Sequence, residues 1–389
     1  MTPSVPKPKP GIAWLTPQSA DTLSGLNTFL KEIREALEPF GLAGEVVRRK
    51  DPGALHRAVR ADVWVINSYH PGWHLLGRFL GKRVITAAHF PFWCREKGES
   101  GGSWRQNLVR EFFWRWECPC GDENRLGHFT VNMAGAMGRV ASLLLAHVVV
   151  APSKSLARHL GVPALVIHYP LAGPKRANRL PQSRTKNLVL ACRLEDQKGV
   201  RDAVGAMVLL PPGAGRFRLH IFGGGPLASW VQEQEKKSGG RILFHGVVDR
   251  DQVRRAMASA FCLLMPSRFL EPAGFSALEA TAVGTPVVFY ADGGLPEMVG
   301  RGGVVAREKS PQGLAAAVLQ LARRPSLWKR CSQEGPRQVR AEFSPRLAAN
   351  RWRRILTQKA DEGFERRVGR QVSFKTSGFG NFTQARFRK

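Results

Sequence analysis

Hydrophobic and polar positions along the chain alternate between short apolar runs and longer stretches with helical spacing. An apolar run at 11–16, for example, is followed by Leu26, Phe29, Leu30 and Ile33, which fall on one helix face. The same succession recurs along the chain, and its apolar runs predict strands at 11–16, 44–49, 63–68, 82–88, 146–151, 164–168, 187–191, 217–222, 242–244, 261–265, 286–290 and 302–305. Strands that alternate with helices are typical of α/β proteins with parallel sheets.

Two such units are expected, because 389 residues with 43% hydrophobic content are enough for two cores of ordinary domain size. A stretch rich in Pro, Arg and Lys at 169–185 interrupts the alternation and is typical of a linker between domains. We therefore place the boundary near residue 170, with one Rossmann-like domain at 11–170 and a second at 171–344. Residues 1–10 are expected to form a disordered lead-in.

The most informative stretch lies in the second unit, where a buried strand is followed by a loop with Glu271 and Gly274. A glycine ahead of a helix lets the backbone approach a ligand closely. The free N–H groups of Phe275 and Ser276 would then point at that ligand, with the positive end of the helix dipole behind them. Glu279 lies eight residues after Glu271, about two turns on by the 3.6-residue repeat. Backbone donors for phosphate and two carboxylates for hydroxyls suit a nucleotide sugar, although two acids eight residues apart also occur on solvated helix faces.

The complete string around these residues is more specific than the acid spacing. It reads P-S-R-x-x-E-P-x-G-F-x-x-L-E-A over 266–280 and is followed by G-T-P-V-V and D-G-G-L-P-E. This string resembles the donor-site signature of glycosyltransferase family 4. The resemblance implies the GT-B fold, in which two Rossmann-like domains with parallel sheets face a central cleft. It further implies an acceptor domain at 11–170, a donor domain at 171–344, and a last helix at 345–358 that returns to the first domain.

The resemblance also assigns roles to cationic and acidic residues. Arg193 and Lys198 lie in C-R-L-E-D-Q-K-G, which resembles the family's G-R-L-x-x-x-K-G with Cys192 in place of the usual glycine. Two cations just past a strand can neutralise a diphosphate leaving group, although solvated surface cations are the simpler interpretation of the residues alone. By the resemblance, Glu271 contacts the transferred sugar and Glu279 contacts the ribose.

Four further positions match the family with different specificity. His89 follows the strand 82–88 and corresponds to the active-site histidine that contacts the transferred sugar, although an isolated histidine is more often structural. Gly25 lies in a loop that reaches the donor's distal phosphate in relatives, many of which have two glycines there, and it equally suits helix–strand packing. Gly223 lies in G-G-G-P, which matches the family's G-x-G-P turn, and Val248 falls where relatives line the base pocket.

The chain is strongly basic, with 59 Lys and Arg, 30 Asp and Glu, and a formal net charge of +29. Such a charge attracts anionic partners such as lipid, nucleic acid or sugar phosphates, or reflects a general compositional bias. Residues 363–389 form a basic, Phe-containing tail that suits lipid head groups or single-stranded nucleic acid, or is a disordered appendage without a partner. We expect a peripheral membrane contact through the basic surface rather than nucleic-acid binding.

The remaining sequence features concern compartment and metal. No signal peptide and no apolar run of membrane-spanning length are found, and six cysteines do not form a disulfide framework, so we expect a cytoplasmic protein, or one peripheral at the inner face of the membrane. Cys94, Cys118 and Cys120 could bind zinc with His128, but the C-x-C spacing argues against a metal site. The tryptophan-rich helix expected at 104–116 suits either a membrane interface or the domain core.

Together these features predict a retaining glycosyltransferase that moves a hexose from a nucleotide-diphosphate sugar, a UDP- or GDP-sugar, to an acceptor hydroxyl. The acceptor would be a glycan or a lipid-linked precursor, by analogy with bacterial surface glycan synthesis. No metal or other cofactor is expected to be required. The alternatives are a GT-B enzyme that does not transfer, of the nucleotide-sugar epimerase type, and a basic nucleic-acid-associated protein.

Overall fold

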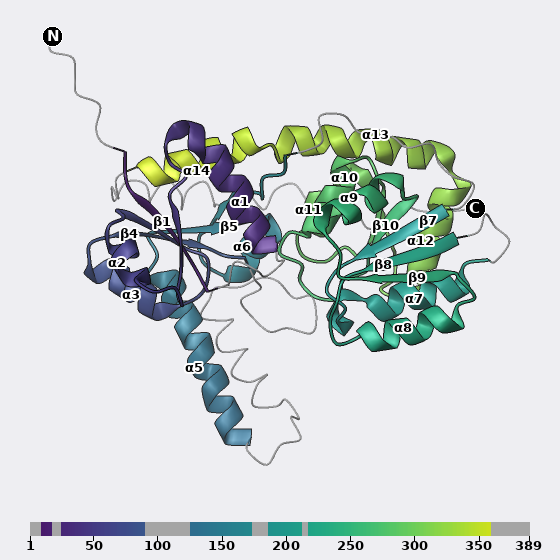
Figure 1. Cartoon of the computed structure of the whole chain (residues 1–389), viewed down its shortest axis with the longest axis horizontal. Coiled ribbons are helices and arrows are strands. Elements are labelled where there is room, and N and C mark those ends of the chain that lie inside the picture. The colour runs from purple at the N-terminus through teal and green to yellow at the C-terminus, as the bar shows by residue number, and fades with distance from the viewer. Residues whose placement is uncertain (1–8, 18–24, 90–124, 173–185, 212–216, 359–389) are drawn as a thin grey trace, which may run out of the picture.

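The computed structural model describes residues 9–17, 25–89, 125–172, 186–211 and 217–358, with the side chains of 125–133 left out. Two six-stranded sheets, in which every strand pair is parallel, lie side by side (Figure 1). Helices cover both faces of each sheet. The chain is therefore an α/β protein, as the alternation of apolar runs and helical stretches predicts.

The first sheet has the strand order β2-β1-β3-β4-β5-β6. Its strands are β1 (Ile12–Thr16), β2 (Glu45–Arg48), β3 (Val63–Ile66), β4 (Arg83–Ala87), β5 (Val148–Ala151) and β6 (Leu165–Val166). Its helices are α1 (Gly25–Leu37), α2 (Ala54–Val59), α3 (Pro71–Phe79), α5 (Arg125–Leu144) and α6 (Lys154–Leu160). Because the strand order reverses beside β1, the point between β1 and β3 is a topological switch point, where open sheets of this type bind ligands at their carboxyl edge.

The second sheet has the order β12-β11-β10-β7-β8-β9. Its strands are β7 (Lys186–Ala191), β8 (Phe217–Phe222), β9 (Ile242–Gly246), β10 (Cys262–Met265), β11 (Val287–Phe289) and β12 (Gly303–Val305). Its helices are α7 (Val200–Leu209), α8 (Ala228–Lys237), α9 (Arg250–Ser259), α10 (Phe275–Ala282), α11 (Leu295–Val299), α12 (Pro311–Arg323) and α13 (Pro325–Glu342). Here the switch point lies between β7 and β10, because the chain adds β8 and β9 on one side before it crosses to β10.

Residues of alternate strand positions build separate cores on the two faces of the first sheet. Trp14 packs on one face with α1 and with the final helix α14 (Pro345–Thr357), and its ring centroid lies 5.2 Å from that of Trp352. Leu15, the next residue, belongs to the core beneath α2 and α3 on the other face. The apolar run at 11–16 is therefore buried on both faces, which is why it lacks an alternating polar pattern.

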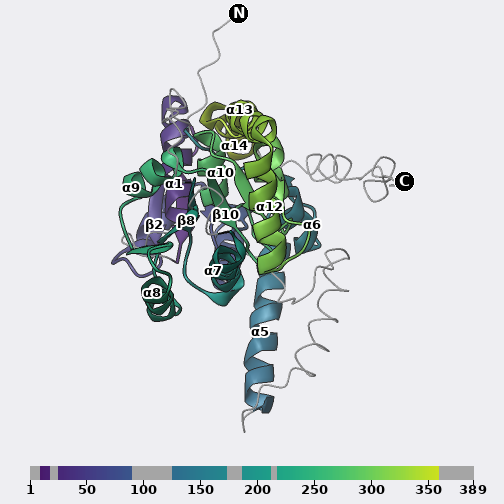
Figure 2. The ribbon, with the colours of Figure 1, turned by 90° about the vertical axis from the view of Figure 1, so that its right-hand side faces the viewer.

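The two halves of the chain are joined by helices and by a shared core. Helix α13 runs along the second half, and α14 continues from it over the first half (Figure 1). Ala273 and Leu278 of the second half belong to the same apolar cluster as Phe29 and Tyr169 of the first. Helix α5, in contrast, projects away from the body of the protein in both views (Figure 1 and Figure 2).

Polar residues cap the first turns of two helices that lie near the carboxyl edges of the sheets. Helix α3 begins at Pro71, where the His70 ring accepts a hydrogen bond from the Trp73 amide. Helix α9 begins at Arg250 behind Asp249, whose carboxylate accepts from the Gln252 amide. Among the described residues, no helix has the length and apolarity needed to cross a bilayer.

Candidate active site

A paired cation and carboxylate lie at the switch point of the second sheet. Lys198 follows β7 in a short 3₁₀ turn, and Glu271 lies in the loop after β10. The Lys198 Nζ lies 2.9 Å from Glu271 Oε2, and the Ser267 hydroxyl donates to the same oxygen at 3.1 Å. The two side chains are only 18% and 10% exposed. Adjacent parallel strands thus place together two residues that are 73 positions apart in the chain.

Helix α10 presents unbonded backbone amides next to this pair. Gly274 precedes it with φ = 72°, a left-handed conformation that favours glycine, and a Cβ there would lie 2.5 Å from a Leu295 methyl carbon. Gly274 provides no side-chain cap, and the amides of Phe275 and Ser276 make no hydrogen bond to any other residue that the structure describes. These donors and the helix dipole favour an anion at this end of α10.

The second acid of the string, Glu279, is engaged by two arginines of α9. Arg250 Nη2 lies 2.6 Å from Glu279 Oε1, and Arg254 Nε lies 3.4 Å from the same atom. Arg250 also approaches Glu32 of α1 at 4.0 Å. Glu279 is therefore part of a charge network that extends from the second half of the chain to the first.

Arg193 does not join the Lys198–Glu271 pair in this conformation. Its Nε lies 2.6 Å from Glu195 Oε1, and its side chain is 71% exposed. The residue that replaces the usual glycine, Cys192, lies within electrostatic range of Lys198 and Glu271, and burial raises the pKa of its thiol to about 12. Cys192 is consequently a neutral thiol rather than a nucleophile at neutral pH.

Two other predicted donor residues lie at the carboxyl ends of β8 and β9. Gly223 has φ = 126°, and a Cβ there would lie 2.0 Å from the carbonyl oxygen of Cys192, so its turn packs directly on the loop after β7. Val248 is half-buried against the core beneath α9, α10 and α11, whereas its neighbour Val247 is 68% exposed. Both predicted residues therefore lie at the same edge of the second sheet as the Lys198–Glu271 pair.

Contacts between aromatic rings connect the start of α10 to the first half of the chain. A Cβ on Gly25, at the start of α1, would lie 3.4 Å from the Phe275 ring. The Phe275 ring stacks on Tyr169 at 5.0 Å between centroids, and the Tyr169 hydroxyl bonds His89 Nδ1 at 2.7 Å. The structure thus brings Gly25 and His89 to the same side of the protein as α10.

His89 itself is enclosed rather than open to a ligand. Its side chain is buried, its Nε2 lies 2.9 Å from Asn67 Oδ1, and its ring packs against Phe29 and Tyr169. Burial lowers the pKa of His89 to about 3, so the ring is neutral at physiological pH. A contact with the transferred sugar would require this side chain to leave at least one of its present partners.

Two polar contacts between the halves of the chain were not anticipated from the sequence. The Ser153 hydroxyl donates to the Pro272 carbonyl oxygen at 2.6 Å, directly behind Glu271. The Glu297 carboxylate accepts from the backbone amides of Lys154 and Ser155 at 2.8 and 2.9 Å, so it caps α6 from the other half. Glu297 belongs to the D-G-G-L-P-E string, so its place in a family motif was the sequence feature that could have indicated a role for it.

The described residues contain no cluster of three or more His, Cys, Asp or Glu side chains that could hold a metal ion. Cys94, Cys118 and Cys120, the helix expected at 104–116 and the tail at 363–389 lie outside the described residues, as does the side chain of His128. What the described residues present at the second switch point is one ammonium group, unbonded amides and two carboxylates. This set can bind a diphosphate and the hydroxyls next to it.

The residues that form this site lie in the part of the chain that resembles known proteins in sequence. Residues 185–324 match the family described as Glycosyl transferases group 1. Glycogen synthase of Mycobacterium tuberculosis is 32% identical over 190 residues, which cover 47% of this chain and 44% of that protein. A glycogen synthase of Thermus thermophilus is 38% identical over 162 residues, which cover 39% and 36%. The chain thus spans less than half the length of these curated relatives.

Solved structures match the fold over most of the chain. Anabaena Alr3699/HepE in complex with UDP and glucose superposes with a TM-score of 0.65 at 17% identity, covering 90% of this chain and 100% of the other. Sucrose-phosphate synthase from Thermosynechococcus elongatus has a TM-score of 0.63 at 20% identity, covering 89% and 98%. Residues 185–324, which contain the Lys198–Glu271 pair and α10, therefore match the glycosyl transferases group 1 family, and the chain as a whole has the GT-B fold.

Proposed function

We propose that the protein is a retaining glycosyltransferase that moves a hexose from a nucleotide-diphosphate sugar to an acceptor hydroxyl. The observation that carries this proposal is the Lys198–Glu271 pair beside the unbonded amides of α10, at the switch point of the second sheet. A UDP-sugar is the favoured donor, because the similar solved proteins include complexes with UDP and UDP-glucose. A GDP-sugar is the alternative donor, and the binding panel below includes one.

The proposed chemistry follows from where charge develops. As the glycosidic bond breaks, negative charge accumulates on the leaving diphosphate, and the Lys198 ammonium and the amides of Phe275 and Ser276 stabilise it. The acceptor oxygen bonds the anomeric carbon, and the leaving diphosphate takes the proton of the acceptor hydroxyl. Glu271 then accepts hydrogen bonds from sugar hydroxyls while it holds Lys198 in place. Glu279 is assigned to the ribose, which requires it to share its carboxylate with Arg250 or to release that side chain. No metal or cofactor takes part in this proposal.

The proposed surroundings follow the same reasoning. The acceptor is a glycan or a lipid-linked precursor, as in the synthesis of bacterial surface glycans, and the strong positive charge supports a peripheral contact with an anionic membrane. Gly25, Gly223 and Val248 would complete the donor site around the distal phosphate and the base. Arg193 would contribute once it turns from Glu195 toward the diphosphate.

A binding panel followed by product analysis tests the proposal. UDP-, GDP- and ADP-glucose are titrated into the wild type, Glu279→Gln and the control Glu342→Gln, which changes an exposed acid at the end of α13. We expect one nucleotide class to bind the wild type and the control, and to bind Glu279→Gln about tenfold or more weakly. A glycosylated product supports transfer. Release of UDP with a sugar inverted at C2 and no glycosylated product would establish the epimerase alternative, and equal binding to all three proteins would remove Glu279 from the site.

A further inference from the structure

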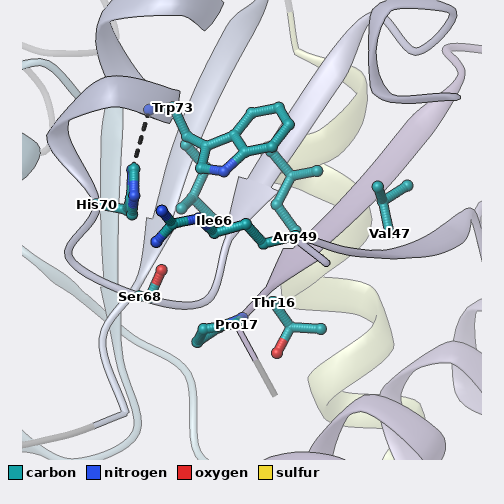
Figure 3. Close-up of a pocket in the computed structure, with 9 residues that line it drawn as sticks. Thr16, Pro17, Val47, Arg49, Ile66, Ser68, His70 and Trp73 are labelled. Atoms are coloured by element: carbon teal, nitrogen blue, oxygen red, sulfur yellow. Dashed lines mark hydrogen bonds between the residues drawn. The ribbon is translucent and has the colours of Figure 1, made fainter. Parts of the chain in front are cut away.

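The first sheet has a pocket at its own switch point, which the donor site does not use. The pocket lies at the carboxyl ends of β1, β2 and β3, and the residues after those strands line it (Figure 3). Its walls are apolar, with Trp73 on one side and Val47 and Ile66 among the remaining residues. Open α/β sheets bind their ligands in this position.

The polar side chains that line this pocket are one guanidinium, one imidazole and two hydroxyls, with no carboxylate among them. Arg49 follows β2, and its side chain extends across the pocket toward His70 and beneath the Trp73 ring (Figure 3). The acids close to β2 have another partner, because Arg57 lies 3.1 Å from Asp51 and 3.5 Å from Glu45. No ion pair joins Arg49 to any carboxylate that the structure describes. A cation in an acid-free pocket favours an anionic ligand.

His70 is held in the tautomer that adds a donor. Its Nδ1 accepts the Trp73 backbone N–H at 3.4 Å, so the proton of the neutral ring is on Nε2. Burial and the charge of Arg49 lower the pKa of His70, which keeps the ring neutral at physiological pH. Trp73 is fixed by an edge contact with Trp64 at 5.4 Å, so its ring offers a rigid flat surface. The hydroxyls of Ser68 and Thr16 complete the polar lining.

The pocket is connected to the donor side by a short chain of contacts. Ser68 follows Asn67, whose Oδ1 lies 2.9 Å from His89 Nε2. His89 bonds the Tyr169 hydroxyl, and Tyr169 stacks on Phe275 at the start of α10. The pocket and His89 therefore lie at the same carboxyl edge of the first sheet, although the apolar lining of the pocket belongs to the core beneath α2 and α3 and Tyr169 belongs to the core on the opposite face.

We propose that this pocket binds the acceptor by an anionic group, a phosphate or a carboxylate, which Arg49 and the Nε2–H of His70 hold while the acceptor ring packs on Trp73. This assignment rests on the proposed function, since it names the substrate class of the same enzyme. Guanidinium binds both oxyanions through paired N–H donors, and a flat indole suits the apolar face of a sugar ring.

Three small probes distinguish the possible sources of the anion. All three probes contain a hexose ring. Glucose 6-phosphate carries a phosphate, methyl glucuronide carries a carboxylate, and methyl glucoside is uncharged. Each is titrated by isothermal calorimetry into the full-length wild type, Arg49→Gln, Trp73→Leu and the matched control Lys50→Gln, which removes an exposed cation one residue outside the pocket. UDP is titrated into the same four proteins to follow the donor site separately.

We expect an anionic probe to bind the wild type and Lys50→Gln about tenfold or more tightly than methyl glucoside, and Arg49→Gln to lose that preference. Trp73→Leu is expected to weaken all three probes, with UDP binding unchanged in every variant. Equal binding of the three probes, or equal loss in Lys50→Gln, would overturn the inference while UDP binding leaves the proposed function intact. Failure of all four proteins to bind UDP would instead contradict the proposed function.

Discussion

The buried Lys198–Glu271 pair should contribute measurably to the stability of the folded protein. The Lys198 ammonium lies 4.3 Å from the Phe269 ring centroid and pairs with Glu271. Replacing Lys198 by Met keeps most of the methylene stem but leaves Glu271 without its counter-charge. Removing one partner of a fully buried pair costs about 3–5 kcal/mol. Because the Lys198 side chain is 18% exposed and the Ser267 hydroxyl still donates to Glu271, we expect a loss at the lower end, about 3 kcal/mol.

Urea unfolding of four proteins tests this value. The control Lys237→Met breaks the exposed i,i+4 pair with Glu233, whose side chains are 65% and 57% exposed, and should cost less than about 1 kcal/mol. The double variant Lys198→Met/Glu271→Gln removes the orphaned charge and should recover more than half of the loss. If Lys198→Met loses no more stability than Lys237→Met, or if the double variant is no more stable than Lys198→Met, the Lys198–Glu271 pair is not a buried ion pair that stabilises the fold.

Three other variants and conditions test separate parts of the structure. Burial lowers the pKa of His74 to about 4 and that of His89 to about 3, below the value of 6.5 in the unfolded chain, so each histidine should remove about 2 kcal/mol of stability as the pH falls from 7 to 5. Thermal unfolding of His74→Gln should therefore depend less steeply on pH than that of the wild type. An unchanged dependence on pH would be inconsistent with the burial of His74. Glu297→Gln should weaken the cap on α6 and lower the free energy of unfolding by about 1–2 kcal/mol. Urea unfolding measures this loss, and an unchanged free energy of unfolding would show that the contact does not stabilise α6. Trp352→Ala should cost about 3–5 kcal/mol and expose α14 to limited proteolysis, whereas resistance equal to the wild type would show that α14 is held by other residues.

Much of the fold and part of the site could be predicted from local signals. The start of α10 at Phe275 follows from Gly274, and the apolar runs locate the strands because both sheets are buried on two faces. The positions of Lys198 and Glu271 after buried strands indicate a shared sheet edge. Their direct contact depends on the adjacency of β7 and β10, which no local pattern contains.

The environments of individual side chains were the least predictable. Glu279 was expected to contact a ribose, but its carboxylate pairs with Arg250 of α9. That contact depends on how α9 packs against α10, which local sequence does not specify. His89 was expected to face a sugar, but the Asn67 and Tyr169 side chains enclose it in this conformation. Arg193 lies in the C-R-L-E-D-Q-K-G string but pairs with Glu195, because a long exposed side chain can reach several nearby carboxylates.

A crystal structure of the protein with bound UDP would show whether the switch point of the second sheet holds the nucleotide diphosphate. We expect the β-phosphate to lie within hydrogen-bond distance, about 3 Å, of Lys198 Nζ and of the amides of Phe275 or Ser276, with the ribose at Glu279. A diphosphate bound elsewhere on the protein, with the Lys198–Glu271 pair and the start of α10 free of contact, would show that this is not the donor site.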